Sequence, residues 1–299
     1  MTRKFARVRL TAIYRKKTHH KSKGTQVVVN ALGIEITEWY HLNGLDLSGE
    51  ISREYESRVV ANTLNVLELL SVMETKATFF VLGIIAEKFP DLVVRIEDAG
   101  HEIASHGYLF KELRAHTIDS FREDLKKSIA ILQGISKKPV VGYRAPGFSM
   151  NSDCLWAMDI LKQEGISYDS SIAPVRHRLY GIPSAPRIPY HIREDLVEFP
   201  PSTVRILFDH VLFSGGAALR DFPYSLIKRT VENLNDQGIV VNFFLRAWEL
   251  NPFFSKAKIP LSFRSEYLNG LEKTKKRFEQ ILTDFQCAPL SKIIQDKKL

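Results

Sequence analysis

Residues 77–105 read ATFFVLGIIAEKFPDLVVRIEDAGHEIAS and contain a strand, a helix and a second strand in direct succession. The apolar run 77–82 is typical of a buried strand. Apolar residues then recur at helical spacing over residues 84–99, and Gly100 stands where a glycine commonly ends a helix. Residues 101–105 predict the next strand. A strand–helix–strand succession of this kind indicates parallel strands buried on both faces of one sheet.

The same alternation extends outward in both directions along the chain. About seven strands and about six helices predict an α/β protein, and we expect a deformed (β/α) barrel of parallel strands, with an open doubly wound sheet as the alternative. Residues 171–222 are rich in Pro and Gly and are expected to form a long loop with little regular structure. The further predicted strands are 27–36, 140–143, 166–169, 196–199 and 239–245, and the further predicted helices are 58–75, 117–134 (capped by Thr117), 152–164, 223–237 and 267–285.

Charge divides the chain into two parts. The 42 basic and 34 acidic residues give a net charge of +8, and nine of the basic residues but none of the acidic ones lie in residues 1–24. The remainder therefore holds 33 basic and 34 acidic residues and is close to neutral. A nucleic-acid-binding domain needs a basic face on the folded body, so this class is excluded. We expect a basic leader, 1–24, and a single domain, 25–299.

The leader allows three interpretations. It could be a solvated mobile arm, a segment that adheres weakly to an anionic membrane surface, or an organelle transit peptide. Arg7 and Arg9 interrupt every apolar stretch that could act as a secretory signal. With two cysteines, Cys154 and Cys287, the chain has neither a disulfide framework nor a cysteine-based zinc motif. Cytoplasmic residence, with contact at the inner membrane face as a further option, is the expectation.

Five separate segments carry a family resemblance. Together they resemble the NodB-homology polysaccharide deacetylases, and most closely the exosortase-associated branch found near exopolysaccharide assembly genes. The resemblance covers roughly residues 27–285, and its specificity comes from the order of the segments along the chain. The segments are ATFFVLG (77–83), AGHEIASHGY (99–108), GYRAPGFSM (142–150), YDSSIAPVRHRLYGIPSAPR (168–187) and AWELNP (247–252).

The resemblance implies a deformed (β/α) barrel that removes acetyl groups from N-acetylated sugars. The family's usual site holds a divalent metal, such as zinc, on one Asp and two His. The metal lowers the pKa of a bound water and polarises the amide carbonyl. A second Asp accepts the proton of that water, and a later His protonates the leaving amine.

This sequence departs from that plan at most of the reacting positions. Glu35 and Glu38 stand where the resemblance expects Asp, and a side chain one methylene longer shifts the carboxylate by more than about 1 Å. His106 is present, but the second metal-binding position is Phe110, which cannot ligate. Arg246 occupies the position of the general acid, and its guanidinium does not exchange a proton near neutral pH. It could hold an oxyanion or a substrate carboxylate instead.

The candidate site residues follow from the matched positions. Glu35, Arg144 and Arg246 are the candidate catalytic residues, with Arg144 matching the arginine that orients the base. Glu38 and His106 are the candidate metal ligands, and His41 is a candidate replacement for the lost one. A salt bridge from Glu35 or Glu38 to Arg144 or Arg246 is the structural alternative. The candidate glycan-binding residues are Trp39, Tyr108, Pro146, Phe148, Asp169 and Trp248.

Three functions remain open at this point. The first is a deacetylase-like protein of exopolysaccharide metabolism that has lost or reduced its metal-dependent hydrolysis, uses no cofactor and binds an N-acetylated glycan. The second is an active deacetylase with zinc or another divalent metal in a rearranged site. The third is a non-catalytic scaffold tethered to the membrane by its leader. Fold alone does not decide among them.

Overall fold

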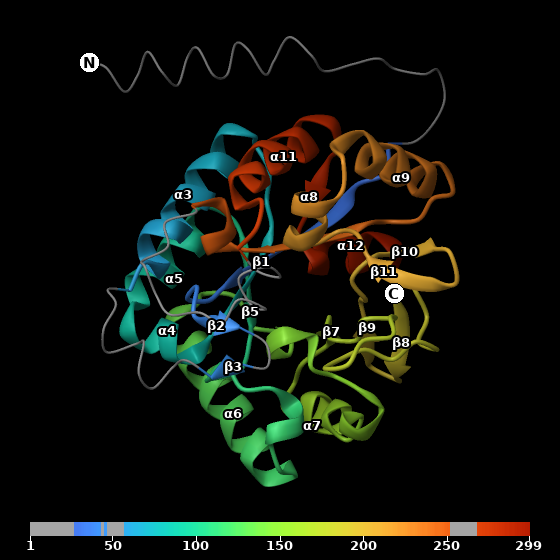
Figure 1. Cartoon of the computed structure of the whole chain (residues 1–299). Coiled ribbons are helices and arrows are strands. Elements are labelled where there is room, and N and C mark those ends of the chain that lie inside the picture. Colours follow the sequence, from blue (N-terminus) through green and yellow to red (C-terminus); the bar gives the residue numbers. More distant parts are fainter. Residues whose placement is uncertain (1–26, 43–44, 47–56, 252–267) are drawn as a thin grey trace, which may run out of the picture.

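The computed structural model describes residues 27–42, 45–46, 57–251 and 268–299. Its main element is a curled nine-stranded sheet in the order β12–β1–β4–β5–β6–β7–β9–β8, with β13 beside β1 (Figure 1). All pairings in this sheet are parallel except β8 with β9. The strands are β1 (Asn30–Ile36), β4 (Thr78–Val81), β5 (Glu102–Ser105), β6 (Gly142–Tyr143), β7 (Tyr168–Asp169), β8 (Tyr190–Arg193), β9 (Leu196–Glu198), β12 (Asn242–Arg246) and β13 (Cys287–Ala288).

Strand β1 separates large from small side chains. Leu32, Ile34 and Ile36 pack into the core beneath the helices. The alternate positions face the barrel interior, where a β-carbon at Gly33 would lie 3.0 Å from the Nη1 atom of Arg144. Glu35 follows on the same inner face and contacts the same guanidinium. The alternation of β1 therefore directs one carboxylate into the barrel.

Helices surround the outer face of the curled sheet (Figure 1). The predicted cap of α6 is confirmed, since the Thr117 side chain accepts from the Ser120 backbone N–H. The single helix predicted over residues 84–99 is wrong, because Pro90, which has no N–H to donate, starts a new helix. The helices are α3 (Val59–Val72), α4 (Gly83–Lys88), α5 (Pro90–Asp98), α6 (Ile118–Ile135), α7 (Ala157–Gln163), α8 (Gly216–Asp221), α9 (Tyr224–Asp236), α11 (Leu271–Asp284) and α12 (Leu290–Lys297).

The gap between β12 and β9 is closed by side chains and loops. The Asn242 amide on β12 donates to the carbonyls of Phe199 and Pro200, at 3.1 and 3.2 Å. The Phe244 N–H donates to the Ser214 carbonyl at 3.0 Å. The sheet thus curls into the expected deformed barrel, and the open doubly wound alternative is not what forms.

The region 171–222 contains more structure than we expected. Besides β8, β9 and α8, it holds the antiparallel hairpin of β10 (Thr203–Ile206) and β11 (Asp209–Leu212). A second small hairpin, β2 (His41–Leu42) with β3 (Leu45–Asp46), follows β1. Pro and Gly in region 171–222 therefore punctuate short strands, and the expectation of one irregular loop is wrong.

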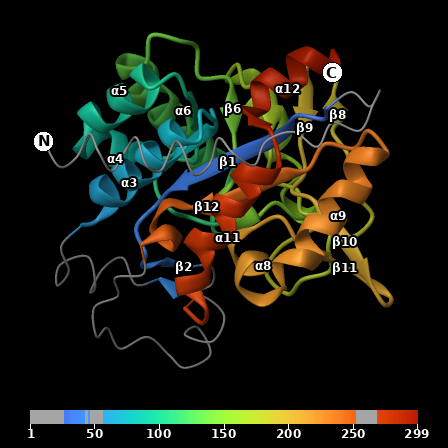
Figure 2. The same cartoon turned by 90° about the horizontal axis from the view of Figure 1, so that it is seen from above.

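Helix α12 covers the end of the barrel where the parallel strands begin (Figure 2). The Leu290 N–H donates to the Thr78 hydroxyl at 2.8 Å, and Leu290 and Ile293 are buried beside Ala31. This helix was not predicted from the sequence. Among the described residues, no helix combines the length and apolar character needed to cross a bilayer. The predicted leader, 1–24, lies outside the described residues.

Candidate functional site

Four predicted site residues meet at the carboxyl ends of the parallel strands. Glu35 lies near the end of β1, His106 follows β5, Arg144 follows β6, and Arg246 ends β12. Because these strands are neighbours in one curled sheet, their ends converge on one opening, as in other β/α barrels. Glu35 lies at the centre of the group and is 2% exposed.

Glu35 contacts three basic side chains. Its Oε1 accepts from Nη1 of Arg144 at 3.3 Å. Its Oε2 lies 3.5 Å from Nε of Arg246 and 4.0 Å from Nε2 of His106. The predicted salt bridges from Glu35 to both arginines are therefore present, and the oxygen that faces the imidazole is already beside a guanidinium.

Arg144 is held rigidly in the barrel interior. Its Nε donates to the Ser170 carbonyl at 3.1 Å, and its Nη2 donates to the Ser170 hydroxyl at 2.8 Å. The guanidinium carbon lies 4.1 Å from the centre of the Phe80 ring, a cation–π contact. The β1 glycine, Gly33, leaves room for this arrangement. Arg144 thus holds the Glu35 carboxylate in place, and its role in orienting a catalytic base stays a prediction.

The charges in this group follow from its burial. Burial alone would raise the pKa of Glu35, but His106, Arg144 and Arg246 together hold that pKa below its ordinary value. Burial lowers the pKa of His106 to about 4, so this imidazole is neutral at pH 7. The two guanidinium groups are therefore the charges that keep Glu35 ionised near neutrality.

The tautomer of His106 is set by one contact. Its Nδ1 lies 2.7 Å from the Arg144 carbonyl oxygen, which can only accept, so Nδ1 carries the proton. Nε2 is then an acceptor, and it is buried without a hydrogen-bond partner. Nε2 of His106 lies 4.0 Å from Oε2 of Glu35. An imidazole nitrogen and a carboxylate oxygen are two of the ligands that a metal site needs.

The remaining predicted ligands do not complete that metal site. Glu38 accepts instead from the Ser57 hydroxyl and, at 3.3 Å, from the Arg58 N–H at the start of α3. His41 stacks on Phe110 with ring centres 5.1 Å apart, and its Nδ1 accepts from the Glu38 N–H. Within the described ranges, no three His, Cys, Asp or Glu side chains are grouped as metal ligands. Zinc sites need at least three protein ligands, so the donors described here do not fit zinc.

The predicted glycan-binding residues lie in different environments. Trp39, Pro146, Asp169 and Trp248 are buried, and Asp169 faces Glu198 on the neighbouring strand. The Tyr108 hydroxyl donates to Glu87 at 2.8 Å, and Lys127 lies 3.6 Å from the centre of the Tyr108 ring. The structure thus brings these residues to several places, and their contact with a glycan stays a prediction.

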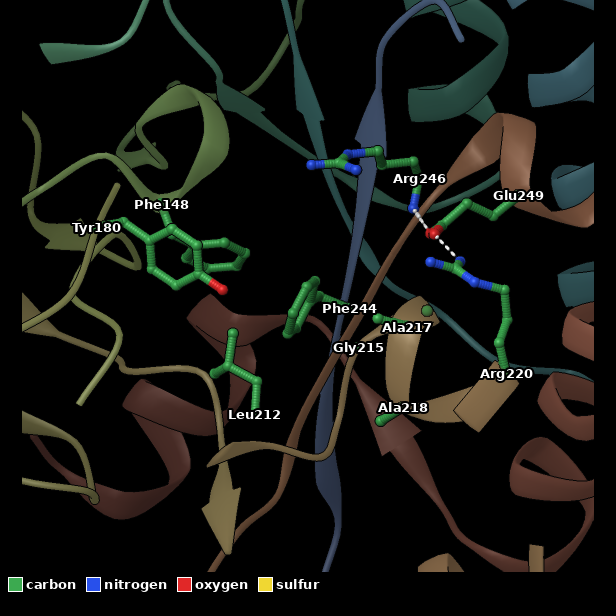
Figure 3. A pocket seen from close by; sticks show the side chains of 11 residues that line it. Phe148, Tyr180, Leu212, Gly215, Ala217, Ala218, Arg220, Phe244, Arg246 and Glu249 are labelled. Carbon is green, nitrogen blue, oxygen red and sulfur yellow. Dashed lines mark hydrogen bonds and ion pairs between the residues drawn. The ribbon is translucent and has the colours of Figure 1, made fainter. Parts of the chain in front are cut away.

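Phe148 lines a cavity of about 240 Å³ beside Arg246. Figure 3 shows the Arg246 guanidinium at one end of this cavity and the rings of Tyr180, Phe148 and Phe244 along it. Residues 215–218 at the start of α8 form another part of the lining. The cavity therefore combines one cationic end with aromatic and apolar walls.

Sequence reasoning missed the residues that hold Arg246 in place. Glu249 accepts from the Arg246 backbone N–H at 2.8 Å and from Nη1 of Arg220 at 2.6 Å. A β-carbon at Gly216 would overlap the Glu249 carboxylate, and one at Gly215 would overlap the Phe244 ring. The run SGGAALR at 214–220 was the available signal, because paired glycines mark a close backbone approach.

Two family sequence models match the chain in succession. Residues 53–166 match the model described as polysaccharide deacetylase. Residues 170–295 match a domain of unknown function, DUF3473. The gap between the matches contains β7, which pairs with β6 and β9 in the single sheet, so the two matched segments share one barrel.

Curated relatives point in the same direction. A peptidoglycan-N-acetylglucosamine deacetylase of Bacillus cereus is 31% identical over 120 residues, which are 36% of this chain and 44% of that protein. A peptidoglycan deacetylase-like protein of Gibberella zeae is 29% identical over 136 residues, 44% of this chain and 39% of that protein. The chain thus spans less than half the length of these two relatives. A chitooligosaccharide deacetylase of Sinorhizobium fredii is 28% identical over 185 residues, 60% of this chain and 82% of that protein.

Solved structures agree on the fold. A Mycobacterium smegmatis protein assigned to the polysaccharide deacetylases superposes with a TM-score of 0.61 at 20% identity, covering 93% of this chain and 94% of that one. The allantoinase PuuE superposes with a TM-score of 0.63 at 14% identity, covering 93% and 97%. Because two different activities share this barrel, the fold does not fix the reaction.

Proposed function

We propose that this chain, whose residues 53–166 match the polysaccharide deacetylase model, binds an N-acetylated glycan at the barrel opening and has lost metal-dependent deacetylation. The main support for this proposal is the position of Oε2 of Glu35. This oxygen lies 3.5 Å from Nε of Arg246 and 4.0 Å from Nε2 of His106. A protein cation therefore stands beside the oxygen that would face a metal.

The chemistry of the reacting positions supports this proposal. Arg246 keeps its proton at any physiological pH, so it cannot protonate a leaving amine. Glu35 is ionised but is held by two guanidinium groups, which stabilise the carboxylate and make it a weaker base. Neither residue is suited to general acid–base catalysis near neutrality. Both are suited to hold a polar ligand in a fixed orientation.

The finer biological setting is also a proposal. The five segments that resemble the exosortase-associated branch support a role in exopolysaccharide metabolism. We propose that the protein acts in the cytoplasm, with residues 1–24 in weak contact with the inner membrane face. The nine basic residues of that segment, unaccompanied by acidic ones, support attraction to anionic lipids.

One observation favours a second function, an active deacetylase with a rearranged metal site. Nε2 of His106 is buried without a hydrogen-bond partner and faces Glu35. A ligand from outside the described residues would be needed to complete such a site. This alternative predicts both metal uptake and hydrolysis, so it separates cleanly from the first proposal.

The test combines metal analysis with an activity assay. The full chain is dialysed against zinc, freed of excess metal, and assayed for bound zinc and for acetate release from chitooligosaccharides. We expect less than stoichiometric zinc, no acetate release, and binding of the oligosaccharide in calorimetry. Stoichiometric zinc together with zinc-dependent acetate release would establish the second function instead.

A further inference from the structure

The charge and shape of the cavity beside Arg246 indicate which kind of sugar it can bind. Two arginines, Arg220 and Arg246, and one acid, Glu249, lie among its lining residues, so the lining has an excess of one positive charge. Both carboxylate oxygens of Glu249 already accept hydrogen bonds: one from the Arg220 side chain and the other from the Arg246 backbone N–H. Glu249 thus positions Arg246 without turning toward its guanidinium.

Accessibility distinguishes Arg246 from the other charges of the site. The side chains of Arg144 and Arg220 are 0% and 3% exposed, whereas that of Arg246 is 13% exposed. The Arg246 side chain is therefore the most exposed of these three arginines. A guanidinium offers a planar pair of donors that matches a carboxylate.

The aromatic and apolar walls of the cavity limit the shape and size of the ligand that it can hold. Phe148 and Phe244 meet edge to face with ring centres 4.7 Å apart, and Tyr180 and Leu212 continue the apolar lining (Figure 3). Aromatic rings of this kind stack on the apolar face of a sugar. The volume of about 240 Å³ is below the range of about 300 Å³ and more that holds a drug-sized ligand. One sugar residue suits it better than several.

We infer that this cavity binds a carboxylated sugar residue of the glycan, with the carboxylate on Arg246 and the ring against Phe148, Tyr180 and Phe244. The inference rests on the proposed function, since it names the substrate class of the same opening. A carboxylate is favoured over a phosphate because one accessible guanidinium in an apolar cavity matches a single negative charge. The position at which the resemblance expects a proton donor would then serve to recognise an anion.

The experiment compares matched ligands on the full chain. The probe is a short oligosaccharide of alternating glucuronate and N-acetylglucosamine, and its methyl ester is the control that lacks the charge. We expect the acid to bind at least about tenfold more tightly than the ester, since a charged hydrogen-bond pair replaces a neutral one. This preference should weaken as salt is added.

Two variants test the location. Ala217→Phe fills the cavity from an exposed position that does not touch Glu35, and it should reduce affinity for the acid at least about tenfold. The exposed helical change Ala61→Phe is its matched control and should leave affinity unchanged. Arg246→Lys keeps a cation near Glu35 but removes the planar fork, so it should reduce the preference for acid over ester.

The outcomes separate the inference from the proposed function. Equal affinity for acid and ester, or full binding by Ala217→Phe, would overturn the carboxylate site and leave glycan binding intact. Displacement of the acid by an equal concentration of inorganic phosphate would overturn the assignment to a carboxylated sugar. Zinc-dependent acetate release would overturn the proposed function, whatever the result with the charged ligand.

Discussion

Asp169 and Glu198 stand opposite each other on strands β7 and β9, with both carboxyl groups fully buried and in direct contact. Burial, and next the Asp169 carboxyl, raise the pKa of Glu198 well above its ordinary value. Burial also raises the pKa of Asp169. Burial and the neighbouring Asp169 carboxyl thus both favour the protonated form of Glu198. This carboxyl pair therefore links strands β7 and β9 of the barrel.

The pair predicts a stability that falls as the pH rises. In the unfolded chain Glu198 loses its proton near the ordinary value of 4.5, whereas in the folded chain the pKa of Glu198 lies well above that value. The free energy of unfolding should therefore decrease from about pH 5 to pH 8, by at most about 1.4 kcal/mol per pH unit. Glu198→Gln preserves the donor and removes the titration, so its curve should be flatter. Urea denaturation across this range measures the difference.

A matched surface change controls this experiment. Glu123→Gln alters an exposed carboxyl on α6 and should leave the pH dependence of the wild type intact. If the stability difference between Glu198→Gln and the wild type does not change between pH 5 and pH 8, folding does not raise the pKa of Glu198.

Arg246 should contribute to stability through Glu35. Arg246→Ala leaves the buried carboxylate with Arg144 alone, and we expect a loss of about 2 kcal/mol, below the range of about 3 to 5 kcal/mol for fully buried pairs because Arg246 is partly exposed. The Glu35→Gln/Arg246→Ala double variant should lose less than the sum of the single changes. A double-mutant cycle by urea denaturation gives this coupling, and additive losses would mean that the two side chains do not interact.

His106 should make the fold sensitive to acid. Burial lowers the pKa of His106 to about 4 from the ordinary value of 6.5, so the unfolded chain takes up the proton first as the pH falls. The free energy of unfolding should therefore decrease between pH 6.5 and pH 4, by at most about 1.4 kcal/mol per pH unit for this group. His106→Asn keeps a donor for the Arg144 carbonyl and should reduce that slope.

A second buried histidine provides the comparison. Burial lowers the pKa of His101 to about 4 as well, and its Nδ1 accepts from the Ala77 N–H at 3.2 Å, which is a structural hydrogen bond away from the candidate site. His101→Asn should reduce the acid slope by a similar amount, and the double variant should reduce it further. A His106→Asn slope equal to that of the wild type would mean that His106 takes up its proton equally readily in the folded and unfolded states.

Restoring donors should restore zinc binding. The Phe110 ring lies 6.1 Å from the His106 ring, and Arg246 stands beside Glu35. The Phe110→His/Arg246→His variant adds two imidazoles to Glu35 and His106 and removes a guanidinium, which gives a donor set typical of zinc. We expect stoichiometric zinc in the variant and a higher melting temperature with the metal present.

The control for that variant keeps the volume and omits the donors. Phe110→Leu/Arg246→Lys should bind no more zinc than the wild type after the same dialysis. A wild-type protein that retains as much zinc as the Phe110→His/Arg246→His variant would contradict the proposed loss of the metal site.

The sequence was sufficient where a local pattern determines the structure. The run 27–36 predicted the strand that β1 forms, and the family resemblance grouped Glu35, Arg144 and Arg246 in one candidate site. It was insufficient where two distant segments decide the outcome. The contact of Asp169 with Glu198 depends on the register of β7 with β9, and the Arg220–Glu249 pair depends on how α8 meets the end of β12. Strand register and helix placement both depend on contacts between distant segments, so the sequence of one segment cannot predict them.

Strand β1 precedes all three of its partner strands along the chain, and those partners are far apart in sequence. It pairs with β4 at residues 78–81, with β12 at residues 242–246 and with β13 at residues 287–288. During translation, the second edge of β1 therefore stays unpaired until residues 242–246 have left the ribosome. Such non-local pairing slows folding and leaves an apolar strand edge open to chaperones or to another nascent chain in the meantime.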